Sequence, residues 1–137
     1  MNKKKGQMGI IDSIGNLFGT EDQPKNKFQW KELSTEEDVA DVMQTSNEKT
    51  QVIYKHSSRC ATSYFALKNV ESITAENQEH ADFHRVDVIG HRPVSMHIAE
   101  KLGIRHESPQ LFVIRDGEVV WSGSHNQIQA SAFEDIL

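Results

Sequence analysis

The chain has 137 residues, of which 36% are hydrophobic and 26% charged, and its formal net charge is -5. These values predict one soluble globular domain with a core of its own, and they argue against a disordered chain or a general nucleic-acid-binding protein. No run of about 18 apolar residues is present, so we expect no transmembrane helix and no stable membrane insertion.

Residues 1–27 are predicted to form a tail ahead of a folded domain that spans residues 28–137. Apolar side chains in the tail recur at helical spacing and predict a short amphipathic helix; they are Ile10, Ile11, Ile14, Leu17 and Phe18. Gly19 and the polar residues after it indicate the end of this helix and a linker. Docking of the helix on its own domain is the simpler expectation, and docking on a membrane or a partner is the alternative.

The rest of the chain alternates between strand and helix patterns. Ser34 and Glu37 have the spacing of a capping box, and Pro93 suits the first turn of a helix that Gly103 ends. Asp116 and Gly117 are typical of a hairpin turn. The predicted strands are 28–33, 50–55, 83–88, 110–115 and 118–122, and the predicted helices are 35–45, 60–74, 91–102 and a last helix capped by Ser124.

This order predicts a sheet that is parallel in part, with an antiparallel hairpin at one edge. Apolar side chains give the predicted inward faces of two helices. In the helix over 60–74 they are mainly Tyr64, Phe65, Leu67, Val70 and Ile73, and in the last helix they are Ile128, Ala132, Phe133 and Ile136.

The single cysteine of the chain, Cys60, falls where the turn after strand 50–55 becomes a helix. Unpaired N–H groups and the helix dipole at such a position favour the thiolate, and Arg59 adds a cation. The alternative is an inert buried thiol. Because no second cysteine can form an internal disulfide, redox chemistry must pass through a mixed disulfide with another molecule, and we expect a reducing, cytoplasmic location.

Two further residues bear on this thiol. Ser63 stands where a CxxC motif has its second cysteine, so it can hydrogen-bond the thiolate but cannot resolve a mixed disulfide. Pro109 precedes an apolar strand, and a cis Ser108–Pro109 bond would turn the Ser108 backbone toward Cys60, where it could pair with an extended substrate. The simpler alternatives are a small helix residue at 63 and a trans proline that starts an edge strand.

Two segments, KHSSRCATSYFAL (55–67) and SPQLFVIRDGEVVWSGSH (108–125), resemble the YtxJ-type monothiol bacilliredoxins of the thioredoxin superfamily. The resemblance covers about residues 28–137. It implies a thioredoxin-like α/β fold, with a central mixed sheet of about five strands flanked by helices. It also implies a cytoplasmic enzyme of redox homeostasis that removes bacillithiol from protein mixed disulfides, with bacillithiol as co-substrate and no bound cofactor. We expect a monomer whose partners are bacillithiolated proteins.

The resemblance assigns roles to individual residues. Cys60 matches the nucleophile, and Ser63 matches the position of the cysteine that resolves the mixed disulfide in CxxC proteins. Pro109 matches the superfamily's cis-proline, and Ser108 matches the residue whose backbone pairs with the ligand. A loop before the last helix matches the place where related proteins hold the ligand's carboxylate; it consists of Gly123, Ser124 and His125. Ala61 departs from the family pattern, which often has proline there, and this leaves the thiol pKa open.

Three other functions are alternatives to this one. A glutaredoxin-like iron–sulfur carrier would also use one cysteine per subunit, but Ala61 and Thr62 are not the residues that its pattern requires. A thioredoxin-like module without catalysis is the second alternative, and a metal site at His56 and Cys60 is disfavoured because the two would not share a helical face. A buried acid beneath the thiol has three weak candidates, Glu32, Asp41 and Asp87, all more simply read as surface residues; for Asp87 we expect a solvated pair with Arg85.

Overall fold

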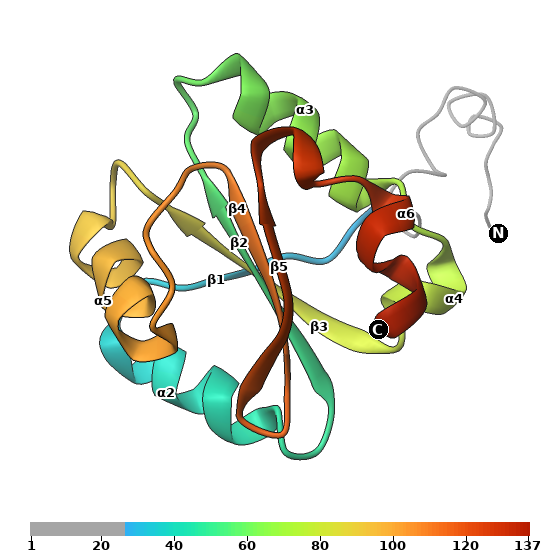
Figure 1. Ribbon diagram of the computed structural model, residues 1–137, viewed down its shortest axis with the longest axis horizontal. Helices are drawn as coiled ribbons and strands as arrows, with labels where there is room; N and C mark the ends of the chain where they lie inside the picture. The colour runs from blue at the N-terminus through green and yellow to red at the C-terminus, as the bar shows by residue number, and fades with distance from the viewer. Residues whose placement is uncertain (1–26) are drawn as a thin grey trace, which may run out of the picture.

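The computed structural model describes residues 27–137, which form a mixed sheet covered by helices on both faces (Figure 1). Five strands in the described part follow the order β1-β3-β2-β4-β5. The first three pair in parallel, and β4 and β5 are antiparallel, which confirms the predicted mixed sheet. The strands are β1 (Lys31–Glu32), β2 (Thr50–His56), β3 (Ala81–Asp87), β4 (Gln110–Arg115) and β5 (Glu118–Ser124).

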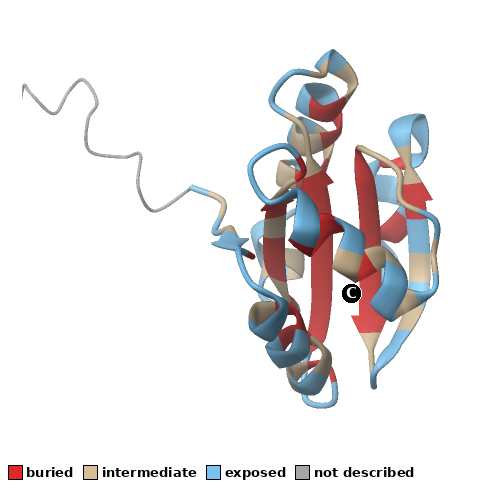
Figure 2. Cartoon of the chain, turned by 90° about the vertical axis from the view of Figure 1, so that its left-hand side faces the viewer, coloured by how far each residue is buried: buried red, intermediate tan, exposed pale blue. Residues whose placement is uncertain are grey.

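Helices lie on both sides of the sheet, and each side has its own apolar core. α2 (Glu36–Thr45) and α5 (Arg92–Leu102) cover one face, and α3 (Ala61–Glu71), α4 (Ala75–Gln78) and α6 (Ala130–Phe133) lie on the other; short 3-10 helices η2 (His125–Gln127) and η3 (Glu134–Ile136) flank α6. Because β2 and β4 are covered on both faces, their apolar residues run without interruption and are buried (Figure 2). The predicted bounds of β2, β3, β4 and α5 differ from these by at most two residues.

The N-terminal strand is much shorter than predicted. Phe28 and Trp30 precede β1 and pack beside the core on the α3 side, with their ring centroids 4.9 Å apart. Only Lys31 and Glu32 pair with β3, so the apolar alternation at 28–30 marks packing at the sheet edge rather than strand pairing. The predicted tail helix lies outside the described residues.

The predicted capping box of α2 is wrong by one residue. Thr35 is the N-cap, its side chain accepts from the Asp38 N–H at 3.0 Å, and Asp38 in turn accepts from the Thr35 N–H at 3.1 Å. Asp38 also accepts from the Ser34 N–H at 2.9 Å. The sequence allows two capping boxes, one at positions 34 and 37 and one at 35 and 38. The structure uses the second, in which the acid is the shorter aspartate.

The inward face of α3 differs from the prediction. The helix begins at Ala61, with Cys60 as its N-cap, and ends at Glu71. Its buried residues are Ser63, Ala66 and Val70, whereas Tyr64 is 53% and Phe65 63% exposed. Small side chains at 63 and 66 let the helix lie close to the sheet, and this turns the two aromatic rings outward.

The C-terminal region is more irregular than a single helix. β5 extends to Ser124, η2 follows it, and α6 has four residues. Ile128 and Phe133 are buried as predicted, but Ala132 is exposed. Asp116 and Gly117 form the predicted turn, both with left-handed φ angles of 52° and 77°.

Candidate functional site

Strand register brings the ends of β2, β4 and β5 to one edge of the sheet (Figure 1). Lys55 is opposite Gln110, and Gln110 is opposite Ser124. The turn that leads to Cys60 starts after β2, Pro109 immediately precedes β4, and the loop after Ser124 begins at the same edge. The His125 N–H donates to the Pro109 carbonyl at 3.1 Å. The residues that the sequence predicted for the site therefore gather at these strand ends, which we call the thiol edge.

Cys60 lies at the N-cap of α3 with an extended backbone (φ -123°, ψ 121°) and is partly exposed. Its thiol pKa is lowered, chiefly by the Ser63 N–H; the Thr62 N–H and the hydroxyls of both residues act in the same direction, and desolvation opposes them. These donors belong to the first turn of α3, where the helix N-terminus favours a negative charge. Arg59 is exposed and is not among the principal causes.

Ser63 is fully buried beneath the turn. Its Oγ accepts from the Ser57 N–H at 3.2 Å, and its backbone N–H donates to the Cys60 carbonyl at 3.1 Å. The residue thus ties the turn of 57–60 to the first turn of α3 and also favours the thiolate. A serine here supports the thiol without offering a second sulfur.

Tyr54 lies below this turn and was missed by the sequence analysis. Its side chain is fully buried, and its hydroxyl donates to the Ser63 carbonyl at 2.7 Å. His56 Nδ1 lies 3.4 Å from the Tyr54 hydroxyl oxygen. Burial raises the pKa of Tyr54, so the hydroxyl keeps its proton and remains a donor. A tyrosine inside a continuous apolar strand was the available signal, because a buried hydroxyl needs a partner.

None of the three carboxylates considered for a buried acid occupies that place. Asp41 and Glu32 are exposed, and Glu32 pairs with Arg85 at 2.7 Å. Asp87 is half-buried and accepts from the Ile89 N–H at 3.0 Å, which stabilises the turn after β3. The predicted pair of Arg85 with Asp87 is therefore wrong, because Arg85 turns to the neighbouring strand.

The Ser108–Pro109 peptide bond is cis, which decides between the two alternatives that the sequence left open. Pro109 is buried, and the Ser108 Oγ is a buried side-chain oxygen without a hydrogen-bond partner among the described residues. Gly123 is buried next to β4, where an added Cβ would lie 2.5 Å from the Trp121 ring and 3.2 Å from the Gln127 side chain. A side chain at 123 would therefore have to displace the Trp121 ring.

The loop predicted to hold a carboxylate already uses two of its N–H groups. The Ser124 N–H donates to Gln127 Oε1 at 2.8 Å, and the His125 N–H is bonded to Pro109. His125 is exposed and has a left-handed φ of 52°. Ser124 and Gln127 also form a capping box, in which the Ser124 side chain accepts from the Gln127 N–H. The Ser124 hydroxyl proton and the His125 side chain therefore remain the groups with which this loop could contact a ligand.

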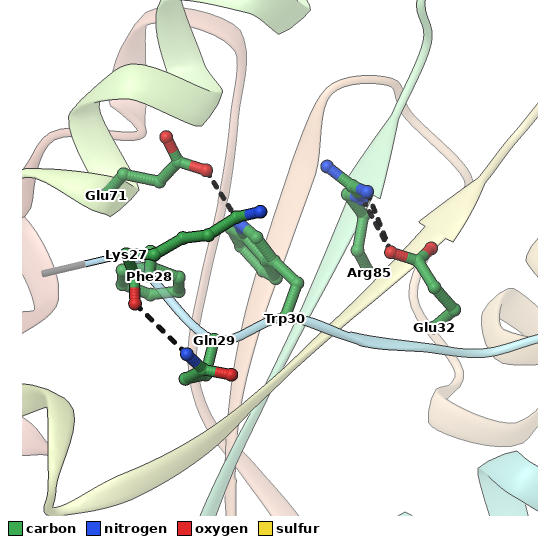
Figure 3. Close-up of a pocket in the computed structure, with 7 residues that line it drawn as sticks. All are labelled: Lys27, Phe28, Gln29, Trp30, Glu32, Glu71 and Arg85. Carbon is green, nitrogen blue, oxygen red and sulfur yellow. Dashed lines mark hydrogen bonds and ion pairs between the residues drawn. The ribbon is translucent and has the colours of Figure 1, made fainter. Parts of the chain in front are cut away.

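A separate pocket of about 650 Å³ lies over β1 and the C-terminal end of α3 (Figure 3). Trp30 and Arg85 line it, with Trp30 Nε1 donating to Glu71 at 2.7 Å and Arg85 bonded to Glu32. Cys60 is not among its lining residues, and Glu71 ends the helix that Cys60 begins. The pocket is thus distinct from the thiol edge.

No group of three or more His, Cys, Asp or Glu side chains among residues 27–137 is placed to hold a metal ion. Within the same range, no helix has the length and apolar character needed to cross a membrane.

Comparisons with known proteins bear on both the fold and the thiol. A family model described as monothiol bacilliredoxin BrxC matches residues 31–133. A solved structure described as having a thioredoxin fold is 29% identical, with 77% of this chain and 91% of that chain covered and a TM-score of 0.68.

Two thioredoxins show a likeness of fold alone. Thioredoxin O2 from Arabidopsis thaliana is 13% identical over 80% of this chain and 95% of that chain, with a TM-score of 0.64. The thioredoxin from Trypanosoma brucei brucei is 15% identical over 78% of this chain and 88% of that chain, with a TM-score of 0.61.

The fold and the thiol site together define a thioredoxin-fold thiol–disulfide oxidoreductase that works with one cysteine. Within that class, the chain belongs to the monothiol bacilliredoxin family, whose model matches most of the described residues. The family and fold predicted from the sequence are confirmed.

Proposed function

We propose that this protein removes bacillithiol from cytoplasmic proteins that carry it as a mixed disulfide. The observation that carries the proposal is the solitary Cys60 at the N-terminus of α3, with its thiol pKa lowered and a buried serine at 63. Membership of the monothiol bacilliredoxin family supports bacillithiol as the small thiol. A lowered pKa raises the thiolate fraction at neutral pH and makes this sulfur a good leaving group as well as a nucleophile.

The reaction takes two exchanges. In the first, the Cys60 thiolate attacks the bacillithiol sulfur, the disulfide bond of the substrate breaks, and the substrate protein leaves as a thiolate that takes a proton from water. In the second, the thiolate of a free bacillithiol attacks the bacillithiol sulfur held on Cys60. The products are bacillithiol disulfide and the Cys60 thiolate, so sulfur, electrons and protons balance without a bound cofactor.

Other residues at the edge are proposed to bind the substrate. The Ser108 backbone beside Pro109 offers hydrogen-bonding groups to an extended substrate. Gly123 leaves β5 without a side chain at the position next to the start of β4. Ser124 and His125 are the proposed contacts to the bacillithiol moiety. Replacement of His125 by alanine is expected to slow transfer more than it changes stability, and unchanged transfer would remove His125 from the site.

The proposal is tested by mass spectrometry of both proteins after a bacillithiolated substrate is mixed with the reduced protein. The expected result is a gain of one bacillithiol on this protein and its loss from the substrate, with no gain in Cys60→Ala. An intact substrate beside a fully reduced Cys60 would refute the proposal. Transfer of the whole substrate protein onto Cys60 would instead show attack at the other sulfur.

A further inference from the structure

Lys55 is a charged residue that the proposed mechanism does not use. It lies on β2 next to Tyr54 but points to the opposite face of the sheet, and its side chain is fully buried. None of the ion pairs found among residues 27–137 involves it. Its Nζ lies 3.0 Å from His106 Nδ1 and 5.7 Å from the centre of the Phe112 ring. Burial lowers the pKa of Lys55 to about 8.

A lysine buried without a carboxylate is costly, and an apolar side chain of similar length would fill this space at lower cost. The contact with His106 is therefore the feature to explain. A charged Lys55 ammonium can only donate, so in this hydrogen bond Nδ1 of His106 is the acceptor and the ring proton is on Nε2. Lys55 can donate to Nδ1 in either charge state, and a proton on Nδ1 would remove the acceptor.

Gln110 lies directly opposite Lys55 on β4 and acts on the same segment. It is 4% exposed, its Nε2 donates to the Arg105 carbonyl at 3.0 Å, and its Oε1 accepts from the Glu107 N–H at 3.1 Å. With the Lys55 contact to His106, two paired sheet residues hold three consecutive residues, 105, 106 and 107. Residue 107 is followed directly by Ser108 and the cis Ser108–Pro109 bond.

We propose that Lys55 is a positioning residue for disulfide exchange: through His106 it fixes the segment 105–107 and thereby the Ser108 backbone that an extended substrate pairs with. The inference rests on the proposed function for the role given to Ser108. It assigns Lys55 no contact with the reacting sulfurs. The thiol itself is governed by groups of α3 on the other side of the sheet.

Two disulfides with the same leaving group separate positioning from thiol reactivity. One is 5,5′-dithiobis(2-nitrobenzoate), which has no main chain, and the other is a cysteine peptide carrying one thionitrobenzoate. Thionitrobenzoate is released from both reagents. In the second it is a better leaving group than the peptide thiolate, so Cys60 attacks the peptide sulfur. In Lys55→Met the rate with the peptide is expected to fall about tenfold, while the rate with the small reagent stays within about twofold.

His106 supplies the matched pair of variants. His106→Ala removes the acceptor and is expected to behave as Lys55→Met, whereas His106→Asn keeps an acceptor near the Nδ1 position and restores most of the peptide rate. Thermal unfolding of the full chain shows whether Lys55→Met folds. If it does not, the two His106 variants test the inference in its place. Equal losses with both reagents, or no loss with the peptide, would overturn the inference.

Neither reagent contains bacillithiol, so the outcome is independent of the proposed function. If the wild-type protein failed to accept bacillithiol from a modified substrate, the proposed function would be refuted. The ratio of the rate with the peptide to the rate with the small reagent would still decide the role of Lys55. If bacillithiol transfer occurred and this ratio of rates were the same in Lys55→Met as in the wild type, only the positioning role would be refuted.

Discussion

His84 is expected to make the stability of this protein depend on pH. The residue lies on β3 with 8% exposure, and its Nε2 is 2.7 Å from Gln51 Oε1. Burial lowers the pKa of His84 to about 4, and Lys31 acts in the same direction. The ordinary value for histidine in an unfolded chain is about 6.5. Because the unfolded chain binds this proton more tightly, the folded state loses stability as the pH falls from about 6.5 toward 4.

The size of the effect follows from the two pKa values. One pKa unit corresponds to about 1.4 kcal/mol, so the full loss from this residue is on the order of 3 kcal/mol, and roughly 2 kcal/mol of it falls between pH 7 and pH 5. In His84→Gln, which cannot take up this proton, the decrease in unfolding free energy between these pH values should be smaller by that roughly 2 kcal/mol. The variant itself should cost about 1 kcal/mol at pH 7 through altered packing and hydrogen bonding.

Urea unfolding at pH 7 and pH 5, followed by circular dichroism, measures both quantities. His80→Gln is the matched control, because His80 is exposed after α4, and it should keep the wild-type decrease. If His84→Gln lost stability with acid as steeply as the wild type, the assignment of the pH dependence to His84 would be wrong.

Four substitutions at the thiol edge give further expectations. Cys60→Ser should abolish adduct formation yet unfold at the same or a higher temperature, because serine is a favoured N-cap; a large destabilisation would contradict this. Tyr54→Phe leaves the Ser63 carbonyl without its donor and should cost about 1–3 kcal/mol in urea unfolding. Ser63→Cys should form an internal disulfide, so that mass spectrometry no longer finds an accumulated adduct. Gly123→Ala forces the Trp121 ring to move and should cost about 1–3 kcal/mol; an unchanged unfolding midpoint would show that the ring adjusts freely.

The parts of the fold that could be predicted are those with a local signal. The apolar runs of β2 and β4, the Asp116-Gly117 turn and the left-handed Gly103 each carry their own evidence in neighbouring residues. The position of Cys60 at a helix start is equally local. Residues 28–30 misled for the opposite reason, because their alternation reflects packing against distant Phe83 and Tyr54.

The parts that could not be predicted depend on long-range contacts. The rotation of α3 follows from how closely Ser63 and Ala66 approach the sheet, and Tyr64 and Phe65 appear apolar in any sequence pattern. The contact of Lys55 with His106 joins residues 51 positions apart. Strand register decides that Lys55 is opposite Gln110, and register is set only when the sheet assembles.

The position of Cys60 at the helix N-cap also couples exchange to folding. The N–H groups of residues 62 and 63 stabilise the thiolate more than a disulfide sulfur, which carries no charge. By thermodynamic linkage, the thiolate form then stabilises the folded chain by the same amount. In the proposed second exchange, release of the Cys60 thiolate restores this interaction with α3. Part of the driving force of that step would then come from the stability of the helix that holds the sulfur.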